Sequence, residues 1–320
     1  MKRSRKSVRT KGSTIPQLRF EDHRLTSFAG LVVIHKFFQF IRFKSHLQKC
    51  FRHLASGKIF DRATIFMQLV IHLLLGFREL RDTTHYQDDA LVQRVLGLKS
   101  LPDVATLSRM LKEADQKSVD KLRQLLGELV LDRLGSLALP RITLDFDGSV
   151  QSTRRRAEGT AAGFNKKKKG ARSYYPLFCT VAQTGQVLNF LHRSGNVHDS
   201  NGAHDFILNC VQQVRNVLPG VIIEVRMDSA FFSDEIVTTL NQKGIEFTIS
   251  VPFERFVALK RMIEGRKRWY TINDELSYFE TLWKPKSWPR RCRFVMIRTL
   301  AKQQQKGPVQ LDLFVPYEYG

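Results

Sequence analysis

The sequence predicts an α/β protein in which a mixed sheet flanked by helices follows an all-helical basic domain and precedes a β-rich segment. Three observations support this order. Apolar residues are spaced as in amphipathic helices up to residue 138, and from Ile142 they occur in short β-branched runs. Beyond residue 200, two helical patterns alternate with two further apolar runs, as in strand-helix-strand units.

The chain carries a large excess of positive charge. Its 320 residues hold 52 Lys and Arg against 30 Asp and Glu, a formal net charge of +22, and residues 1–60 hold 14 of the basic and 2 of the acidic residues. Such an excess predicts a polyanionic partner, most simply nucleic acid, with a membrane surface as the competing anion. The apolar run at residues 64–77 contains His72 and is shorter than the roughly 20 residues of a membrane span, so we expect no membrane insertion.

The cysteines and the N-terminus indicate the compartment. Cys50, Cys179, Cys210 and Cys292 are far apart and form no CxxC pair, which argues against a structural zinc site and against a disulfide framework. The basic N-terminus is not followed by the apolar core of a signal peptide. We therefore expect a reducing, cytoplasmic setting, with the protein associated with the nucleoid.

The first half of the chain is predicted to be helical. Residues 1–24 form a basic tail for which we expect disorder, and residues 25–138 are predicted to form a helical DNA-binding domain. Apolar spacing and capping residues predict helices at residues 28–43, 62–80, 89–96, 103–114 and 119–134.

The third and fourth of these helices have the dimensions of a helix-turn-helix. Asp103, which follows Pro102, is suited to cap the second helix of the pair. That helix would carry Thr106, Arg109 and Lys112 on one side, where they suit contacts to phosphates or bases. The alternative is an ordinary helical hairpin with a solvated polar face.

The sheet is predicted in residues 139–254. The strands are predicted at residues 142–146, 177–182, 186–193, 221–227 and 245–251, and the helices at 203–217 and 233–242. A turn around Gly185 joins the second and third strands, so the first three strands should form an antiparallel meander. The later strand-helix-strand units imply parallel neighbours. Residues 255–320 are β-rich, with strands predicted at residues 269–272, 294–299 and 309–315.

Three carboxylates stand near the ends of two predicted strands. Asp145 and Asp147 lie two residues apart and share one face of the first strand, and Asp228 follows the fourth strand. Because ligand sites of open α/β sheets lie at the carboxyl ends of strands, we expect Asp147 and Asp228 to meet if those strands are neighbours. Carboxylates without His or Cys favour Mg²⁺ or Mn²⁺ over zinc. The alternative is a turn at Asp147 and Gly148, with Asp145 as a solvated edge residue.

A basic loop follows the first strand. Its cations are Arg154, Arg155, Arg156, Lys166, Lys167, Lys168 and Lys169. If the acids bind metal ions, these residues would hold DNA phosphates beside them. For any single residue the alternative is a solvated charge in a loop.

These residues resemble a DDE-type insertion-sequence transposase with an RNase H-like catalytic core. The matching segments are residues 144–149 (LDFDGS), 163–166 (GFNK), 173–177 (SYYPL) and 226–232 (RMDSAFF), within a resemblance that covers about residues 60–320. The resemblance implies that residues 139–254 are the catalytic core and that residues 255–320 are a β-rich insertion of it. It makes Asp147 the first catalytic acid and Asp228 the second, with Asp145 as the fallback for the first.

The same resemblance implies the activity and its requirements. The expected function is metal-dependent cleavage and transfer of DNA strands in transposition, with two Mg²⁺ or Mn²⁺ ions held by the acids. The expected partners are double-stranded DNA, as transposon ends and target, and further copies of the chain.

One departure from the family pattern concerns the third acid. Family members carry a glutamate on a helix beyond the fifth strand, and the chain stops at Gly320 without one that we would assign. Glu254, Glu264, Glu275 and Glu280 lie in polar or strand-like stretches of the sequence. We therefore expect a truncated copy that cleaves DNA poorly. The alternatives are an inactive DNA-binding remnant and an RNase H-like nuclease of another purpose.

A second polar cluster invites a metal site. His192, His198 and His204 lie near Asp199 and Asp205. We interpret this stretch as a hydrogen-bonded connector, because a loop rich in His, Asp, Asn and Ser is usually one.

Overall fold

A computed structural model of the chain describes residues 26–55, 57, 59–153, 157–163, 165, 168–198, 201–252, 255–300 and 317–319. The chain divides into two compact units, Met1–Leu125 and Leu126–Gly320. The long helix α6 (Gln116–Leu137) includes the point of division. No helix among the described residues is both long enough and apolar enough to cross a membrane. The domain limits at residues 24, 138 and 254 remain predictions.

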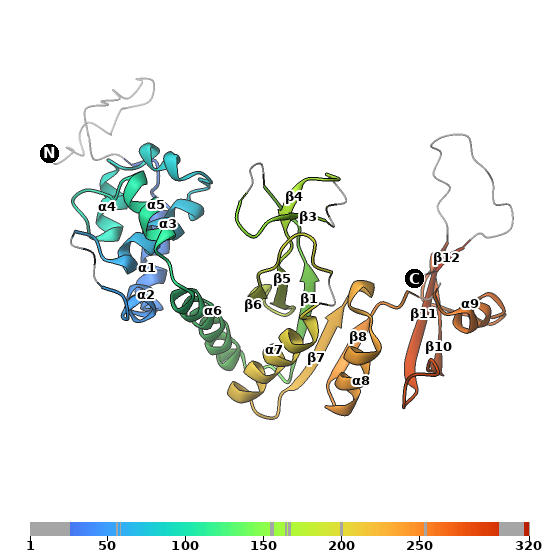
Figure 1. The fold of residues 1–320 in the computed structure, drawn as a ribbon. Helices are drawn as coiled ribbons and strands as arrows, with labels where there is room; N and C mark the ends of the chain where they lie inside the picture. The colour runs from blue at the N-terminus through green and yellow to red at the C-terminus, as the bar shows by residue number, and fades with distance from the viewer. Residues whose placement is uncertain are drawn as a thin grey trace, which may run out of the picture. The chain divides into compact units, whose positions relative to one another are not determined.

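The described part of the first unit is helical, as the sequence predicts. Its elements are α1 (Leu31–Phe40), α2 (Phe43–Phe51), α3 (Arg62–Leu74), the 3₁₀ helix η2 (Leu80–His85), α4 (Ala90–Leu96), α5 (Val104–Lys112) and the first turns of α6 (Figure 1). Asp61 and Asp89 cap α3 and α4 by accepting backbone N–H groups. The cap predicted at Asp103 is confirmed, since its Oδ1 accepts from Thr106 N at 2.8 Å.

The first two predicted helices differ from the observed ones, and the second, predicted at residues 62–80, ends at Leu74. The sequence predicts one helix over residues 28–43, whereas α1 ends at Phe40 and α2 begins at Phe43. Between them Arg42 adopts the left-handed conformation, with φ at 50°. That conformation is uncommon for a side chain of this kind and turns the chain between the two helices. Because neither Gly nor Asn marks the turn, composition alone gives no signal for it.

The second unit contains a five-stranded mixed sheet. Its strands are β1 (Arg141–Gly148), β5 (Leu177–Val181), β6 (Gln186–Leu191), β7 (Ile222–Met227) and β8 (Glu246–Ile249), in the spatial order β6-β5-β1-β7-β8. The β1–β5 and β5–β6 pairs are antiparallel, and the β1–β7 and β7–β8 pairs are parallel. This meander followed by parallel strands confirms the predicted RNase H-like sheet. The helices α7 (Ala203–Val217) and α8 (Asp234–Gln242) form the predicted crossovers (Figure 1).

The two faces of this sheet differ in character. The apolar face carries Ile142, Leu144 and Phe146 of β1 with Ile223, Val225 and Met227 of β7, packed against buried side chains of α6, α7 and α8. The polar face carries Arg141, Thr143, Asp145 and Asp147 of β1, Glu224 and Arg226 of β7, and Glu246 and Thr248 of β8. Both faces come from the same strands, because successive side chains of a strand point to opposite faces of the sheet.

The basic loop after β1 contains a small sheet that the sequence does not predict. Its strands are β2 (Gln151–Ser152), β3 (Ala161–Ala162) and β4 (Arg172–Tyr174), in the order β2-β4-β3. Asn165 is buried and its amide donates to Ser152 Oγ at 2.9 Å. The strands are too short to give an alternating pattern, which explains why the sequence shows only a loop.

The connector that follows β6 is fixed by one buried arginine. Arg193 donates to the carbonyl oxygens of Tyr175, His198 and Asn201 at 3.0–3.1 Å. His204 lies near Thr239, its Nε2 being 3.2 Å from the hydroxyl oxygen. These contacts support the interpretation of the His-rich stretch as a connector, and Asp199 lies outside the described residues.

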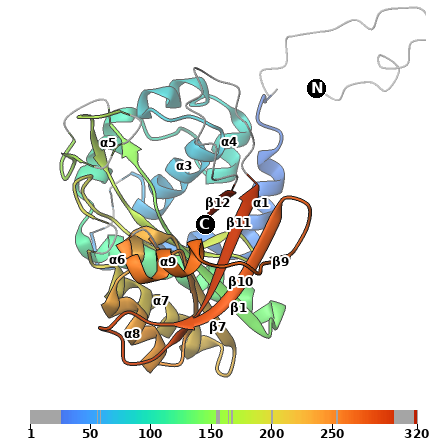
Figure 2. The ribbon, with the colours of Figure 1, turned by 90° about the vertical axis from the view of Figure 1, so that its right-hand side faces the viewer.

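The remainder of the second unit forms a separate antiparallel sheet with one helix. The strands are β9 (Tyr270–Thr271), β10 (Leu276–Trp283), β11 (Cys292–Leu300) and β12 (Tyr317–Tyr319), in the order β12-β11-β10-β9, preceded by α9 (Val257–Glu264). Figure 2 shows β10 and β11 running together as its long strands. Buried Phe279, Trp288 and Phe294 form a core that also includes Val237 of α8.

Parts of this segment correct the sequence-based expectations. Neither α9 nor β10 is predicted, and the strand predicted at residues 309–315 lies outside the described residues. Glu264 ends a helix that buries Leu259 and Ile263, so its context is not the polar or strand-like one expected. Lys260 and Arg261 lie between these two buried residues, so the sequence shows no clear apolar stripe for this helix.

Candidate functional site

Asp147 and Asp228 lie at the same edge of the sheet on adjacent strands. The parallel register pairs Asp145 with Arg226 and Phe146 with Met227, so the next position on each strand is Asp147 and Asp228. Paired residues of neighbouring strands point to the same face, and the strands are about 4.8 Å apart. The structure therefore brings together the two acids that the sequence predicts to meet.

Local structure explains why both acids stand at this edge. Asp228 follows β7 and caps the 3₁₀ turn η3 (Ser229–Phe231), where its Oδ1 accepts from Ala230 N at 2.9 Å. Asp147 precedes Gly148, the last residue of β1. Both aspartates are exposed, whereas their neighbours Phe146 and Met227 are buried. The edge thus presents two carboxylates to solvent above a packed core.

Asp145 has a different environment from Asp147, although the two share a strand face. Its Oδ1 accepts from Arg226 Nε at 2.6 Å and its Oδ2 accepts from Arg226 Nη2 at 2.7 Å. These hydrogen bonds, with the attraction between the charges, raise the pKa of the Arg226 guanidinium. Both carboxylate oxygens of Asp145 are therefore engaged by a cation of the protein itself.

Behind this pair the polar face is hydrogen-bonded across three strands. Glu224 accepts from Thr143 Oγ1 at 3.1 Å and from Thr248 Oγ1 at 2.9 Å. Arg141 of β1 forms an ion pair with Glu246 of β8, which raises the pKa of the guanidinium. Polar side chains of β1, β7 and β8 are thus joined to one another behind the Asp145–Arg226 pair.

The acids fit a divalent cation by their chemistry. Mg²⁺ is ordinarily bound by one or two carboxylates, with waters and substrate phosphates as its other ligands. Two like charges on adjacent strands repel each other, and a cation between them removes that repulsion. Among the described residues, no group of three or more His, Cys, Asp or Glu gathers where it could hold a metal ion.

The predicted DNA-contacting residues are placed in two regions. Arg154, Arg155, Arg156, Lys166 and Lys167 lie outside the described residues. Lys168 and Lys169 are exposed in the turn before β4, and Lys168 N donates to Asn165 Oδ1 at 3.0 Å. On α5, Arg109 and Lys112 are exposed, and Arg109 Nη2 donates to Thr106 Oγ1 at 3.2 Å.

A further set of cations, on α2, is missed by the sequence-based argument. Lys44 and Lys49 of α2 and its C-cap residue Arg52 are exposed, whereas Leu47 and Cys50 of the same helix are buried. No ion pair is recorded for these three cations within the described part of the chain. The sequence does indicate them in one respect, because it contains no Asp or Glu between residues 22 and 61 to offset their charge.

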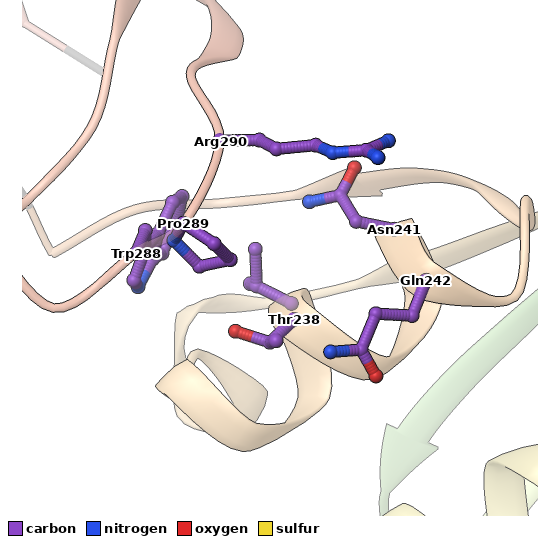
Figure 3. A pocket seen from close by; sticks show the side chains of 7 residues that line it. Thr238, Asn241, Gln242, Trp288, Pro289 and Arg290 are labelled. Atoms are coloured by element: carbon purple, nitrogen blue, oxygen red, sulfur yellow. The ribbon is translucent and has the colours of Figure 1, made fainter.

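The second unit also contains a cavity of about 330 Å³ between α8 and the segment joining β10 to β11 (Figure 3). It is lined by Val237, Thr238, Asn241, Gln242, Trp288, Pro289 and Arg290. Trp288 is buried and donates from Nε1 to Asp234 Oδ1 at 2.5 Å. Asn241 Nδ2 donates to Cys292 Sγ at 3.4 Å. These contacts join α8 to the second sheet.

Comparison with known proteins identifies one family. The family model described as transposase DDE domain group 1 matches residues 9–311. No curated protein matches the chain.

Several solved structures are similar to the chain at low identity. A piggyBac transposase synaptic complex with hairpin DNA has 15% identity and a TM-score of 0.38 over 82% of this chain and 60% of that one. A Mos1 transposase paired-end complex has 10% identity and a TM-score of 0.26 over 67% of this chain and 74% of that one. A Drosophila P element transposase strand transfer complex has 12% identity and a TM-score of 0.31 over 72% and 50%. The match to the piggyBac chain thus spans less than two thirds of its length.

Proposed function

The chain belongs to the transposase DDE domain group 1 family, and on that premise we propose that it carries out metal-dependent cleavage and transfer of DNA strands in the transposition of an insertion sequence. Asp147 and Asp228 are the proposed catalytic acids and metal ligands. The observation that carries this proposal is the register of β1 and β7, which aligns the two aspartates at one edge of the sheet. Asp145 is not assigned as a ligand, because Arg226 engages both of its oxygens.

The proposal assigns metal binding to the two aspartates and phosphate binding to the lysines of the basic loop. Asp147 and Asp228 would hold Mg²⁺ or Mn²⁺, which when bound activates an attacking oxygen and stabilises the leaving one. The exposed Lys168 and Lys169 belong to the basic loop that leaves the end of β1, where they would hold phosphates near the acids. Because only two carboxylates among the described residues are assigned to the site, we expect weak metal binding and slow cleavage.

Cleavage assays test the two acids directly. The substrate is a plasmid carrying the DNA that flanks the gene, incubated with Mg²⁺ or Mn²⁺. We expect slow cleavage by the wild type and a loss of a hundredfold or more in D147N and in D228N, since each removes one ligand charge. Cleavage by D147N/D228N as fast as by the wild type would reject the assignment, and rapid Mg²⁺-dependent cleavage by the wild type would refute the expected low activity.

DNA binding by the helical unit is a separate part of the proposal. The exposed cations of α2 suit the phosphate backbone, because no acid between residues 22 and 61 offsets them. Log affinity falls with log salt, and each lost phosphate contact reduces the steepness of that fall by about 0.9. We therefore expect K44Q/K49Q to reduce the steepness by roughly 2, measured without metal by fluorescence anisotropy.

The matched control for this binding test carries the same change of charge elsewhere in the unit. Arg81 is paired with Glu79 at 2.7 Å, and Lys117 lies in sequence between Asp115 and Asp120. R81Q/K117Q should therefore leave the slope nearly unchanged. A slope that falls equally in both double variants would show that only net charge matters.

A DNA-binding protein without cleavage activity is the second candidate function. It is favoured by the environment of one further acid, Glu280, which Arg293 holds through two hydrogen bonds. Under this alternative, D147N and D228N keep the metal-free affinity for DNA, and no variant or wild-type protein cleaves it. A collapse of the metal-free affinity in these variants would mean that the acids have a structural role.

A further inference from the structure

One cross-strand pair lies directly behind the two acids. Asp145 and Arg226 are partners in the β1–β7 register and stand two residues before Asp147 and Asp228 on their strands. All four side chains therefore project from the polar face. The guanidinium of Arg226 donates through Nε and Nη2 to the two oxygens of Asp145, at 2.6 and 2.7 Å. A two-bond pair of this kind fixes the orientation of its partners as well as their distance.

The exposure of this pair argues that its main effect is geometric. The side chains of Arg226 and Asp145 are 50% and 33% exposed. Ion pairs so exposed add little to stability, because water screens the attraction and both side chains lose freedom. The pair nevertheless links the end of β1 to the end of β7, two residues before each acid. It also keeps Asp145 from acting as a third carboxylate beside Asp147.

We propose that Asp145 and Arg226 are a positioning pair for the metal site. Their paired hydrogen bonds hold the ends of β1 and β7 so that Asp147 and Asp228 converge on one divalent cation, and neither member of the pair touches that cation. This inference rests on the proposed function and deepens it. Hydrogen-bonded groups behind metal ligands typically change metal affinity by about 10–100-fold, and this pair should act in that range.

Mn²⁺ binding without DNA tests the pair. The probe is Mn²⁺ alone, and the readout is the electron paramagnetic resonance signal of the free ion, which decreases on binding. R226K keeps the charge but lacks the planar fork that donates two parallel hydrogen bonds, so it should weaken binding at least tenfold. The reversed pair D145R/R226D restores the paired geometry and should return the affinity to within threefold of the wild type. R226Q provides a second measurement of the same loss.

The matched control is Arg141, the other strand-bridging arginine on the polar face. It pairs with Glu246 and lies six residues before Asp147. R141K should therefore bind Mn²⁺ within twofold of the wild type. Thermal unfolding of every variant, followed by circular dichroism, separates lost metal affinity from lost folding.

Each outcome of this experiment decides between defined alternatives. Folded R226K and R226Q with wild-type Mn²⁺ affinity would overturn the positioning role. A loss in D145N as large as in D147N, without rescue by the reversed pair, would make Asp145 a ligand and also overturn it. Wild-type affinity in D147N and D228N would overturn the proposed function together with this inference. If only D147N and D228N lost Mn²⁺ affinity, the proposed function would be supported and the positioning role of Asp145 and Arg226 would be rejected.

Discussion

The apolar face and the polar face of the five-stranded sheet are built from alternate residues of the same strands, yet one is packed against helices and the other carries the candidate site. On the apolar face, the side chains of β1 are almost fully buried against helices. On the polar face, Thr143 donates to Glu224 and Arg226 donates to Asp145, and Asp147 and Asp228 stand beyond them at the edge. Stability is therefore expected to reside on one face and metal binding on the other.

The comparison also separates two aspartates that the sequence leaves equivalent. Asp145 and Asp147 lie on the same face of β1, two residues apart. What distinguishes them is their neighbour: Arg226 of β7 is paired with Asp145, whereas Asp147 comes one position after the last pair, Phe146 and Met227, as does Asp228 just beyond β7. A guanidinium engages both oxygens of Asp145, whereas two carboxylates close together repel each other, an arrangement that a bound cation stabilises.

The largest expected effect belongs to the apolar face. Phe146 is 2% exposed and packs edge-to-face on Phe206, with ring centroids 5.8 Å apart. F146A should lower the free energy of unfolding by about 3–5 kcal/mol, because the cavity adds to the lost burial. Chemical denaturation measures this loss. If F146A lost less than about 1 kcal/mol, the apolar face would not be the principal source of stability.

The next effect belongs to the edge of the polar face. Mn²⁺ at a hundred times its Kd should raise the free energy of unfolding of the wild type by about 2.7 kcal/mol, since it binds only the folded state. F146A should keep this increment, and D147N/D228N should lose it while unfolding near the metal-free wild type. The measurement is denaturation with Mn²⁺ or with a chelator. An increment that survives in D147N/D228N would place the metal elsewhere.

The smallest effect belongs to the interior of the polar face. Thr143 Oγ1 donates to Glu224 and accepts from Gln183 Nε2 at 3.2 Å. T143V removes this hydroxyl at nearly constant volume and should cost about 1 kcal/mol of unfolding free energy. The Mn²⁺ increment should be unchanged, because the acids keep their register. A large loss of that increment in T143V would show that the whole polar face supports the metal site.

Much of the sheet is predictable because its pattern is periodic. Strands β5 and β7 and helix α7 follow the alternating or helical spacing of their apolar residues closely. The helices at the start of the chain are less predictable, since Arg42 turns the chain without a residue that marks a turn. The helix α9 is hidden because cations separate its two buried residues, Leu259 and Ile263.

The candidate site is predictable in part for similar reasons. The meeting of Asp147 and Asp228 follows from strand order, which the sequence indicates through its strand-helix-strand units. The role of Arg226 does not follow, because an arginine in a strand has the appearance of a solvated residue until its partner across the sheet is known. Roles that depend on register between distant strands thus require the structure.

Anomalous diffraction from crystals soaked in Mn²⁺ tests the central claim most directly, because it locates the ion without reference to activity. We predict an anomalous peak bridging the carboxylates of Asp147 and Asp228, with Asp145 still held by Arg226. A peak on other side chains, or none at Mn²⁺ concentrations that saturate the binding measured in solution, would contradict the assignment of these two aspartates as the metal site.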